Sequence, residues 1–157
     1  MNEIKGYIIR TIDYKETAKL LYAYTDQGII SMVAHGVKKM NSPLRHIAQT
    51  GMMAMLTLSS GKLPTLKEAS LINYYPAIKK DFNKHHIMYT IHDYLLYNTH
   101  EHDDHLKLFL FIEKVLSRLN DTPLSHELLL IFELKFLHFL GIGLNFRQCP
   151  VCQTQEG

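Results

Sequence analysis

Two cysteines near the carboxyl end of the sequence have the spacing of a zinc-binding turn. Cys149 and Cys152 enclose Pro150 and Val151, and such a tight turn directs two thiolates at one metal ion. They are the only cysteines in the chain, whereas a tetrahedral zinc ion takes four ligands. The cysteines therefore form half of a metal site, and we expect the chain alone not to bind zinc tightly.

A second set of candidate functional residues is basic. Three of them fall in the polar segment AHGVKKMNSPLRH at 34–46, and three precede it. Cationic side chains in barrel loops bind the phosphates of nucleic acids, and neighbouring aromatic rings stack on the bases. The predicted phosphate contacts are Arg10, Lys15, Lys19, Lys38, Lys39 and Arg45. The candidate stacking rings are Tyr14, Tyr22 and Tyr24, although tyrosines at alternate strand positions more often belong to a core or rim.

The charge of the chain is divided between its halves. Residues 1–80 hold 11 Lys or Arg and 5 Asp or Glu, a net charge of +6, whereas residues 81–157 hold 6 and 10, a net charge of −4. This division favours a basic module that binds a polyanion, joined to a more acidic module with another task. Chance variation between two solvated surfaces is the alternative.

The segment HEHDDH at 100–105 concentrates possible metal ligands but lacks a known spacing. The residue four positions after His100 is Asp104, so the H-E-x-x-H pattern of zinc proteases is not met. A solvated linker is favoured, and a metal-dependent hydrolase built on His100, His102 and His105 stays an alternative. A phosphate-binding glycine loop and a nucleophile elbow are not recognisable, so the sequence predicts a protein without enzymatic activity. The remaining helical histidines are expected at core edges or in hydrogen-bonded core positions: His85, His86, His92 and His138.

Five short runs rich in β-branched and aromatic residues occupy the first half of the chain. They lie at 4–12, 18–25, 29–36, 52–60 and 66–75, and turn residues such as Asp26-Gln27-Gly28 separate them. Five strands with one long connection after the third predict a partly open barrel of the OB type, and a β-sandwich fragment is the alternative. Ser42 and Pro43 predict a short helix within the long connection.

Beyond Pro76 the apolar period becomes helical. Apolar residues recur every three or four positions over 87–98 and again over 108–119. Thr122 and Pro123 open a third helix that is apolar nearly all round over 128–140, so we expect it at the buried centre of the helical part. The fold class is therefore α+β, with a barrel domain at 1–78 and a helical domain at 79–157 that is interrupted at the partial zinc module.

Taken in order, these motifs resemble one known family. The stretch from Gly6 to Leu58 is similar to the amino-terminal barrel of RecO, the bacterial DNA repair and recombination mediator family. The resemblance lies in Arg10 at the end of the opening strand, the D-Y-x-E motif at 13–16, the turn at Gly28 and the K-K pair at 38–39. YYPAIKKD at 74–81 resembles the junction to the helical domain, and FELKFLHFLGIGLNFRQCPVC at 132–152 resembles its helix and first zinc cysteines.

The resemblance implies a non-enzymatic role in DNA repair. Members of this family bind single- and double-stranded DNA, promote annealing, and act with RecR to load RecA onto strands coated by single-stranded-DNA-binding protein (SSB). Many members carry a second cysteine pair, which implies one structural zinc in the full-length protein and a chain cut within that module. The helical domain is expected to bind the SSB tail beside Lys114, Arg118 or Lys135.

The expected location is the bacterial cytoplasm, in association with the nucleoid. The first residues carry charges within their apolar run and do not fit a signal peptide, and no stretch reaches the ~20 apolar residues of a spanning helix. A protein-interaction adapter that does not bind DNA is the main alternative function.

Overall fold

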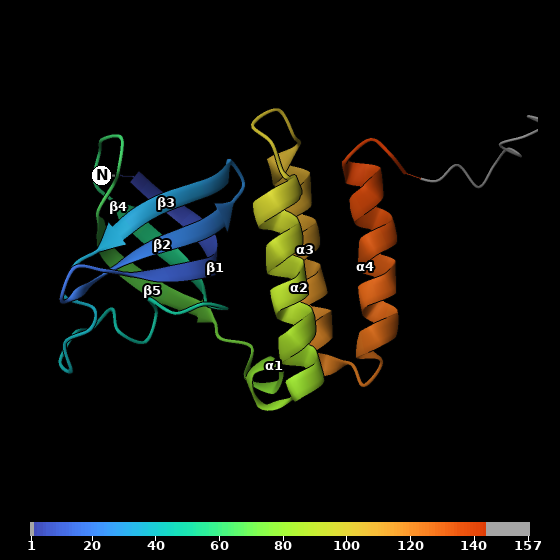
Figure 1. Ribbon diagram of the computed structural model, residues 1–157, viewed down its shortest axis with the longest axis horizontal. Coiled ribbons are helices and arrows are strands. Elements are labelled where there is room, and N and C mark those ends of the chain that lie inside the picture. Colours follow the sequence, from blue (N-terminus) through green and yellow to red (C-terminus); the bar gives the residue numbers. More distant parts are fainter. Residues whose placement is uncertain (1, 144–157) are drawn as a thin grey trace, which may run out of the picture.

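Five strands precede four helices in the computed structural model, which describes residues 2–143 (Figure 1). The strands are β1 (Asn2–Tyr14), β2 (Ala18–Thr25), β3 (Gly28–Ala34), β4 (Met53–Leu58) and β5 (Leu66–Asn73). The helices are α1 (Pro76–Lys80), α2 (Phe82–Asn98), α3 (His105–Asp121) and α4 (Ser125–Phe139). The predicted α+β class, the five strands and the hairpin turn before Gly28 are confirmed.

The strands form one antiparallel sheet that curls into a nearly closed barrel. Its order is β3-β2-β1-β4-β5, and a parallel bridge between Val33 and Thr65 brings its two edge strands together. The amide of Val33 also donates to the carbonyl of Pro64 at 2.9 Å. This order matches the predicted OB-type barrel, and the alternative of a β-sandwich fragment is wrong because the sheet closes on itself.

The long connection from β3 to β4 closes one end of the barrel. Val37, Ile47 and Ala48 are buried in the barrel core together with residues of the strands. Successive hydrogen-bonded turns run through the connection, such as the bond from the amide of Ala48 to the carbonyl of Leu44 at 2.8 Å. The predicted short helix after Ser42 is wrong, because these turns do not continue into a regular helix.

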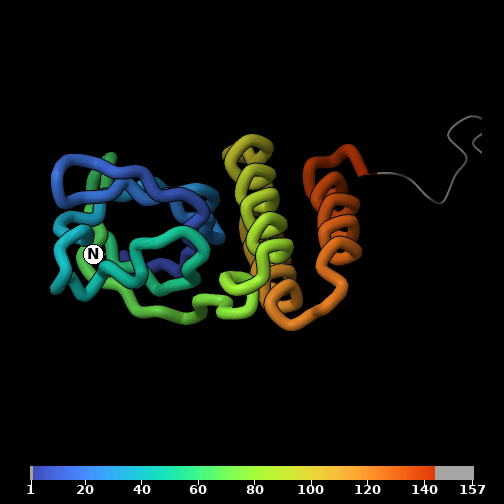
Figure 2. The backbone as a smooth tube through the Cα atoms, turned by 60° about the horizontal axis from the view of Figure 1, so that its bottom comes forward, coloured from blue at the N-terminus to red at the C-terminus, as the bar shows by residue number. Residues whose placement is uncertain are grey.

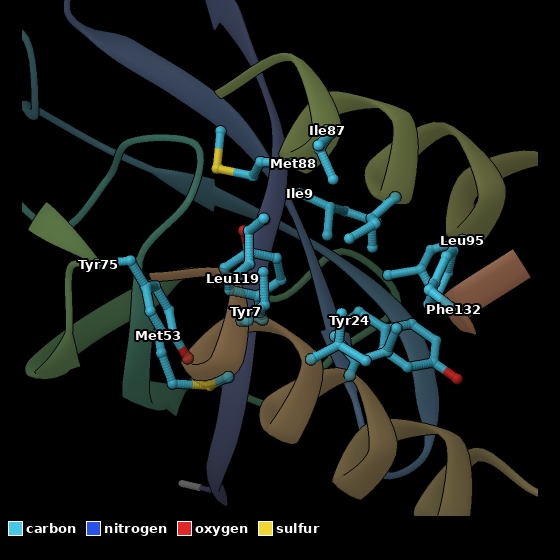
Figure 3. Packing of buried hydrophobic residues seen from close by; sticks show 14 of the residues in the cluster. Tyr7, Ile9, Tyr24, Met53, Tyr75, Ile87, Met88, Leu95, Leu119 and Phe132 are labelled. Atoms are coloured by element: carbon cyan, nitrogen blue, oxygen red, sulfur yellow. The ribbon is translucent and has the colours of Figure 1, made fainter. Parts of the chain in front are cut away.

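The outer face of β1, β2 and β4 belongs to a second core, which the barrel shares with the helices. Tyr7, Ile9, Tyr24 and Met53 are buried there against side chains of α1, α2, α3 and α4, as Figure 3 shows for the labelled residues. Over its central residues, β1 is therefore covered on one face by the barrel core and on the other by the core shared with the helices. Helices α2 and α3 consequently lie directly against the barrel (Figure 1).

A buried polar pair crosses this shared core. The Nε2 atom of His92 on α2 lies 2.8 Å from the hydroxyl of Tyr7 on β1, and both side chains are fully or almost fully buried. Burial lowers the pKa of His92 to about 3, with a smaller contribution from nearby His85. The imidazole is therefore neutral near pH 7, and the expectation of a hydrogen-bonded core histidine is confirmed for His92.

Helix α4 forms the layer farthest from the barrel, as Figures 1 and 2 both show. Phe132 and Phe136 fix it to the shared core, whereas Leu130, Ile131 and Leu134 remain exposed. The prediction that this helix is the buried centre of the helical part is wrong, because α2 and α3 separate it from the sheet. No helix within residues 2–143 has the length and apolar character needed to cross a membrane.

The transition from barrel to helices lies at Tyr75 and Pro76. Tyr75 is buried in the shared core with a positive φ of 49°, and Pro76 opens α1 at the first helical position. The side-chain oxygen of Asn120 on α3 accepts the amide of Ala77 at 2.9 Å, which satisfies one free donor at the start of α1. The boundary predicted at residue 78 stays a prediction.

Replacing Phe132 by alanine should destabilise the protein by about 3–5 kcal/mol, because the change leaves a cavity where α4 meets the shared core. Leu130 on the same helix is 58% exposed, so its replacement by alanine should change stability by less than about 0.5 kcal/mol. Urea unfolding followed by circular dichroism measures both. Equal losses for the two variants would contradict the position of α4.

The pKa of His92 predicts acid sensitivity. Its folded pKa of about 3 lies below its ordinary value of 6.5, so the unfolded chain takes up the proton first as pH falls. Its contribution to stability is therefore complete above about pH 6.5 and decreases toward pH 3, with a slope approaching about 1.4 kcal/mol per pH unit. Urea unfolding between about pH 7 and about pH 5 should show a weaker pH dependence for His92→Gln than for the wild type.

The exposed His126 provides the matched control for this experiment. His126→Gln should keep the pH dependence of the wild type, since this side chain is not buried on folding. A His92→Gln variant with the same pH dependence as the wild type would contradict the buried, neutral imidazole.

Candidate nucleic-acid interface

Two loops meet at one end of the barrel and bring together four of the predicted cations. The amide of Lys38, in the connection after β3, donates to the carbonyl of Thr17, in the turn between β1 and β2, at 3.2 Å. Lys19 pairs with Asp13 on one side and Ala34 on the other, so β2 begins directly beside both loops. The cations near this end, called the lysine end below, are Lys15, Lys19, Lys38 and Lys39.

The four lysines differ in their exposure and in their ion pairing. Lys38 forms an ion pair with Asp13 at 3.0 Å, so part of its charge is already neutralised. Lys15 and Lys39 are exposed, and the Lys15 ammonium lies over the ring of Tyr14 at 5.3 Å. Lys15 begins the turn between β1 and β2, and its φ of 54° lies in the left-handed region that such turns use. Lys15 and Lys39 are therefore the cations most accessible to a phosphate.

Arg45 lies farther along the same connection. Its guanidinium contacts the sulfur of Met40, and its carbonyl accepts the side-chain amide of Gln49 at 3.2 Å. The half-buried side chain is thus held by the turns of the connection. Its predicted role as a phosphate contact stays a prediction.

Arg10 faces away from the lysine end. The pairing of β1 with β2 shifts between Ile8 and Arg10, so Ile9 is an extra residue in a bulge. Because side chains alternate between faces, Arg10 shares the outer barrel face with its partner Tyr22, whereas Asp13 and Lys19 point to the other face. The predicted patch is therefore divided between two faces of the β1–β2 ribbon.

The three candidate stacking tyrosines have different environments. Tyr24 is 0% exposed, and its hydroxyl lies 3.1 Å from Nδ1 of His105, while burial raises its pKa well above the ordinary value. The stacking prediction is wrong for Tyr24, because its ring faces are covered by the shared core. Tyr22 is half-buried beside that core, and Tyr14 is 38% exposed at the tip of the ribbon. Tyr14 is therefore the most exposed ring of this set, and the Lys15 ammonium lies over one of its faces.

A cleft of about 420 Å³ lies between β1 and α2. Its walls are polar and aromatic side chains from both domains, and Ile9, His92 and Leu96 also line it. The polar and aromatic residues of this cleft, called the β1–α2 cleft below, are Arg10, Thr11, Thr50, Tyr89, Asp93 and Tyr97. Sequence reasoning missed this site. The available signal is the i, i+4, i+8 spacing of Tyr89, Asp93 and Tyr97, which places them on one helix face.

The segment at 100–105 is the turn that leads into α3, which begins at His105. The side chain of Asp103 accepts the amide of His100 at 2.6 Å, and that of Asp104 accepts the amide of Lys107 at 3.2 Å. Asp103 and Asp104 thus have turn and capping roles. Over residues 2–143 no group of three metal-binding side chains is found, so the hydrolase built on His100, His102 and His105 gains no support. Cys149 and Cys152 lie outside the described residues.

A groove of about 450 Å³ runs between α3 and α4 near the loop that joins them. Leu124 and Ile131 line it, and Arg118 lies at its edge together with Asp121 and Glu127. The other two predicted cations are exposed along the same two helices, and the Lys135 ammonium lies over the ring of Phe111 at 5.7 Å. The groove therefore combines apolar lining with one nearby cation and two carboxylates. Lys114 is one helical turn before Arg118.

Comparison with known proteins assigns the chain to a family. Residues 1–75 match the family model Recombination protein O N terminal, and residues 80–157 match Recombination protein O C terminal. Relatives named DNA repair protein RecO include those of Bacillus pumilus, Clostridium perfringens and Bacillus subtilis, at 31%, 30% and 27% identity. The alignments cover 98–100% of this chain and 60–63% of those relatives, so the chain spans about three fifths of their length. With both family models matched in order along nearly the whole sequence, the chain belongs to the RecO family of DNA repair and recombination proteins.

Proposed function

We propose that the protein is a DNA-binding recombination mediator that holds single- and double-stranded DNA at the lysine end of its barrel. The observation that carries this proposal is the backbone bond between Thr17 and Lys38, which joins two basic loops at one end of the barrel. Loops around an OB-type barrel bind nucleic acid through such cations and nearby aromatic rings. Membership of a family whose relatives are named DNA repair proteins supports the same role.

Strand annealing is the activity that this surface can support without an enzymatic step. Two complementary strands repel each other through their phosphates, and exposed lysines reduce that repulsion by replacing the counterions around each strand. Base pairing then supplies the driving force. The protein would act by raising the local concentration of strands that remain free to pair.

We also propose the partners that the family implies: RecR, RecA through RecR, and the tail of SSB. The α3–α4 groove supports the last of these, because its apolar lining and the exposed Arg118 suit a peptide with apolar and acidic residues. Asp121 and Glu127 restrict where an acidic group can bind, so the peptide carboxylates would lie on the Arg118 and Lys114 side.

Salt dependence tests the DNA site. If the protein neutralises about five phosphates of a single strand, log affinity should fall with log salt with a slope near −3.5. Lys15→Ala and Lys39→Ala should each reduce the magnitude of that slope by about 0.7. Lys38→Ala should have a smaller effect, because Asp13 already neutralises part of its charge. Fluorescence anisotropy with a labelled oligonucleotide measures all three.

Lys67 on β5 is the matched control, because it is exposed but lies outside the two basic loops. Lys67→Ala should keep the slope of the wild type. Unchanged slopes for Lys15→Ala and Lys39→Ala would remove these lysines from the DNA site. A wild-type protein that binds no DNA at either low or moderate salt would favour the adapter alternative.

Arg118→Ala should weaken binding of an acidic, apolar peptide by roughly fivefold, which corresponds to about 1 kcal/mol for an exposed ionic contact. Lys107→Ala on the first turn of the same helix is the control and should leave the affinity unchanged. Isothermal titration calorimetry with a peptide ending in acidic and apolar residues measures both. Equal affinities for Arg118→Ala and the wild type would exclude the groove as the peptide site.

A further inference from the structure

The β1–α2 cleft joins the DNA-binding barrel to the helical domain. Arg10 and Thr11 come from β1, and Tyr89, Asp93 and Tyr97 come from one face of α2. Its volume of about 420 Å³ lies within the range of about 300–1,000 Å³ that is usual for small-ligand sites. The cleft is thus large enough to hold one planar group together with the atoms that attach it to a chain.

The bulge at Ile9 places Arg10 at this cleft. Without the extra residue, alternation along β1 would turn the Arg10 side chain to the opposite face of the ribbon. With it, Arg10 shares the outer face with Ile12 and Tyr14. Both of the latter are partly exposed, at 38% each. An outer surface therefore leads along one face of the ribbon from the Lys15 tip to Arg10.

Two tyrosines of the cleft have rings that a ligand can reach. Tyr97 is 72% exposed and Tyr89 is 45% exposed. The ring of Tyr89 makes edge contacts with His85 and His92, at centroid distances of 5.0 Å and 5.6 Å, so neighbouring rings fix its orientation. An exposed ring held in one orientation is suited to stack on another planar group at a small entropic cost.

Asp93 limits what can enter between these tyrosines. Its carboxylate repels phosphate and accepts hydrogen bonds from amino groups. Cytosine, adenine and guanine carry an exocyclic amine, whereas thymine does not. The carboxylate therefore favours the edge of an amine-bearing base, and Arg10 on the opposite wall is the cleft residue suited to the phosphate of that nucleotide.

A buried polar atom without a partner lies in a residue of the cleft wall. His92 lines the cleft, its Nε2 atom is bound to Tyr7, and its Nδ1 atom is buried with no hydrogen-bond partner in the described part of the chain. Unpaired polar atoms in a protein interior are uncommon and need an explanation. Nδ1 is covered by protein, so a ligand in the cleft would contact the exposed side chains around it and not this atom.

We propose that the β1–α2 cleft binds one amine-bearing base of single-stranded DNA, with Tyr97 and Tyr89 stacking on it, Asp93 accepting its amine and Arg10 contacting the adjoining phosphate. This inference rests on the proposed function, because it extends the strand from the lysine end along the outer face of the ribbon. The helical domain then takes part directly in DNA binding. The cleft also makes binding sensitive to base identity, which the lysine end is not.

Tyr97→Ala tests the stacking part of the proposal. Because Tyr97 is exposed, the variant should fold like the wild type, which thermal unfolding checks. It should weaken binding of a labelled oligodeoxycytidine by at least about fivefold and leave the salt slope unchanged, since no phosphate contact is lost. Tyr97→Phe should restore the affinity, because the ring is kept. Tyr74→Ala removes an exposed tyrosine outside the cleft and should bind like the wild type.

Asp93→Asn tests the base preference. The wild type should bind oligodeoxycytidine more tightly than oligodeoxythymidine of equal length. The variant should bring the ratio of the two affinities close to one, because an asparagine amide can accept from the cytosine amine and can equally donate to O4 of thymine. Measuring both in the same buffer removes the contribution of the lysine end, which acts equally on both strands.

The outcomes separate this inference from the proposed function. Wild-type affinity in Tyr97→Ala, or an unchanged base preference in Asp93→Asn, would overturn the cleft as a base site. If Lys15→Ala and Lys39→Ala still flattened the salt slope in that case, the proposed function would stand. A wild-type protein without affinity for either oligonucleotide would overturn both.

Discussion

The central constraint on this structure is that β1 is buried on both of its faces. One face completes the barrel core through Ile8, and the other carries Tyr7 and Ile9 into the core shared with the helices. A tyrosine buried there needs a partner for its hydroxyl, and His92 on α2 provides it at 2.8 Å. This bond adds a directional contact to the apolar packing that holds α2 against the barrel. Every feature between the two domains, including the β1–α2 cleft, depends on that position.

The basic residues divide into two environments with different physical consequences. The lysine end is a cluster of charges, whose interactions are long-ranged and sensitive to salt. Arg10 lies on the other face of the ribbon among tyrosines and a carboxylate, where contacts are short-ranged and directional. One strand hairpin thus carries two surfaces of different chemistry, and the bulge at Ile9 separates them.

Much of the fold could be predicted from the sequence, because period-two and helical patterns are local. The five strands, the turn before Gly28 and the long helices followed from such patterns. Which tyrosines are buried could not be predicted in this way, because Tyr14 and Tyr24 have similar strand contexts and differ only in what packs on them. The apolar character of α4 was visible, but its outer position depends on the order of the helices in space. The β1–α2 cleft joins residues about 80 positions apart, so only Tyr89, Asp93 and Tyr97 left a local signal.

The shared core has a consequence for how the parts of related proteins can be exchanged. The two family models meet between residues 75 and 80, as though barrel and helices were independent modules. The packing is not modular there, because Tyr7, Tyr24 and Met53 of the barrel are interior residues of the helical half. A chimaera that joins this barrel to the helices of a distant homologue would have to preserve a histidine opposite Tyr7 and matching volumes around Met53. Exchange of the barrel or the helices is therefore limited by how well their buried side chains fit together, and not by the length or flexibility of the segment that joins them.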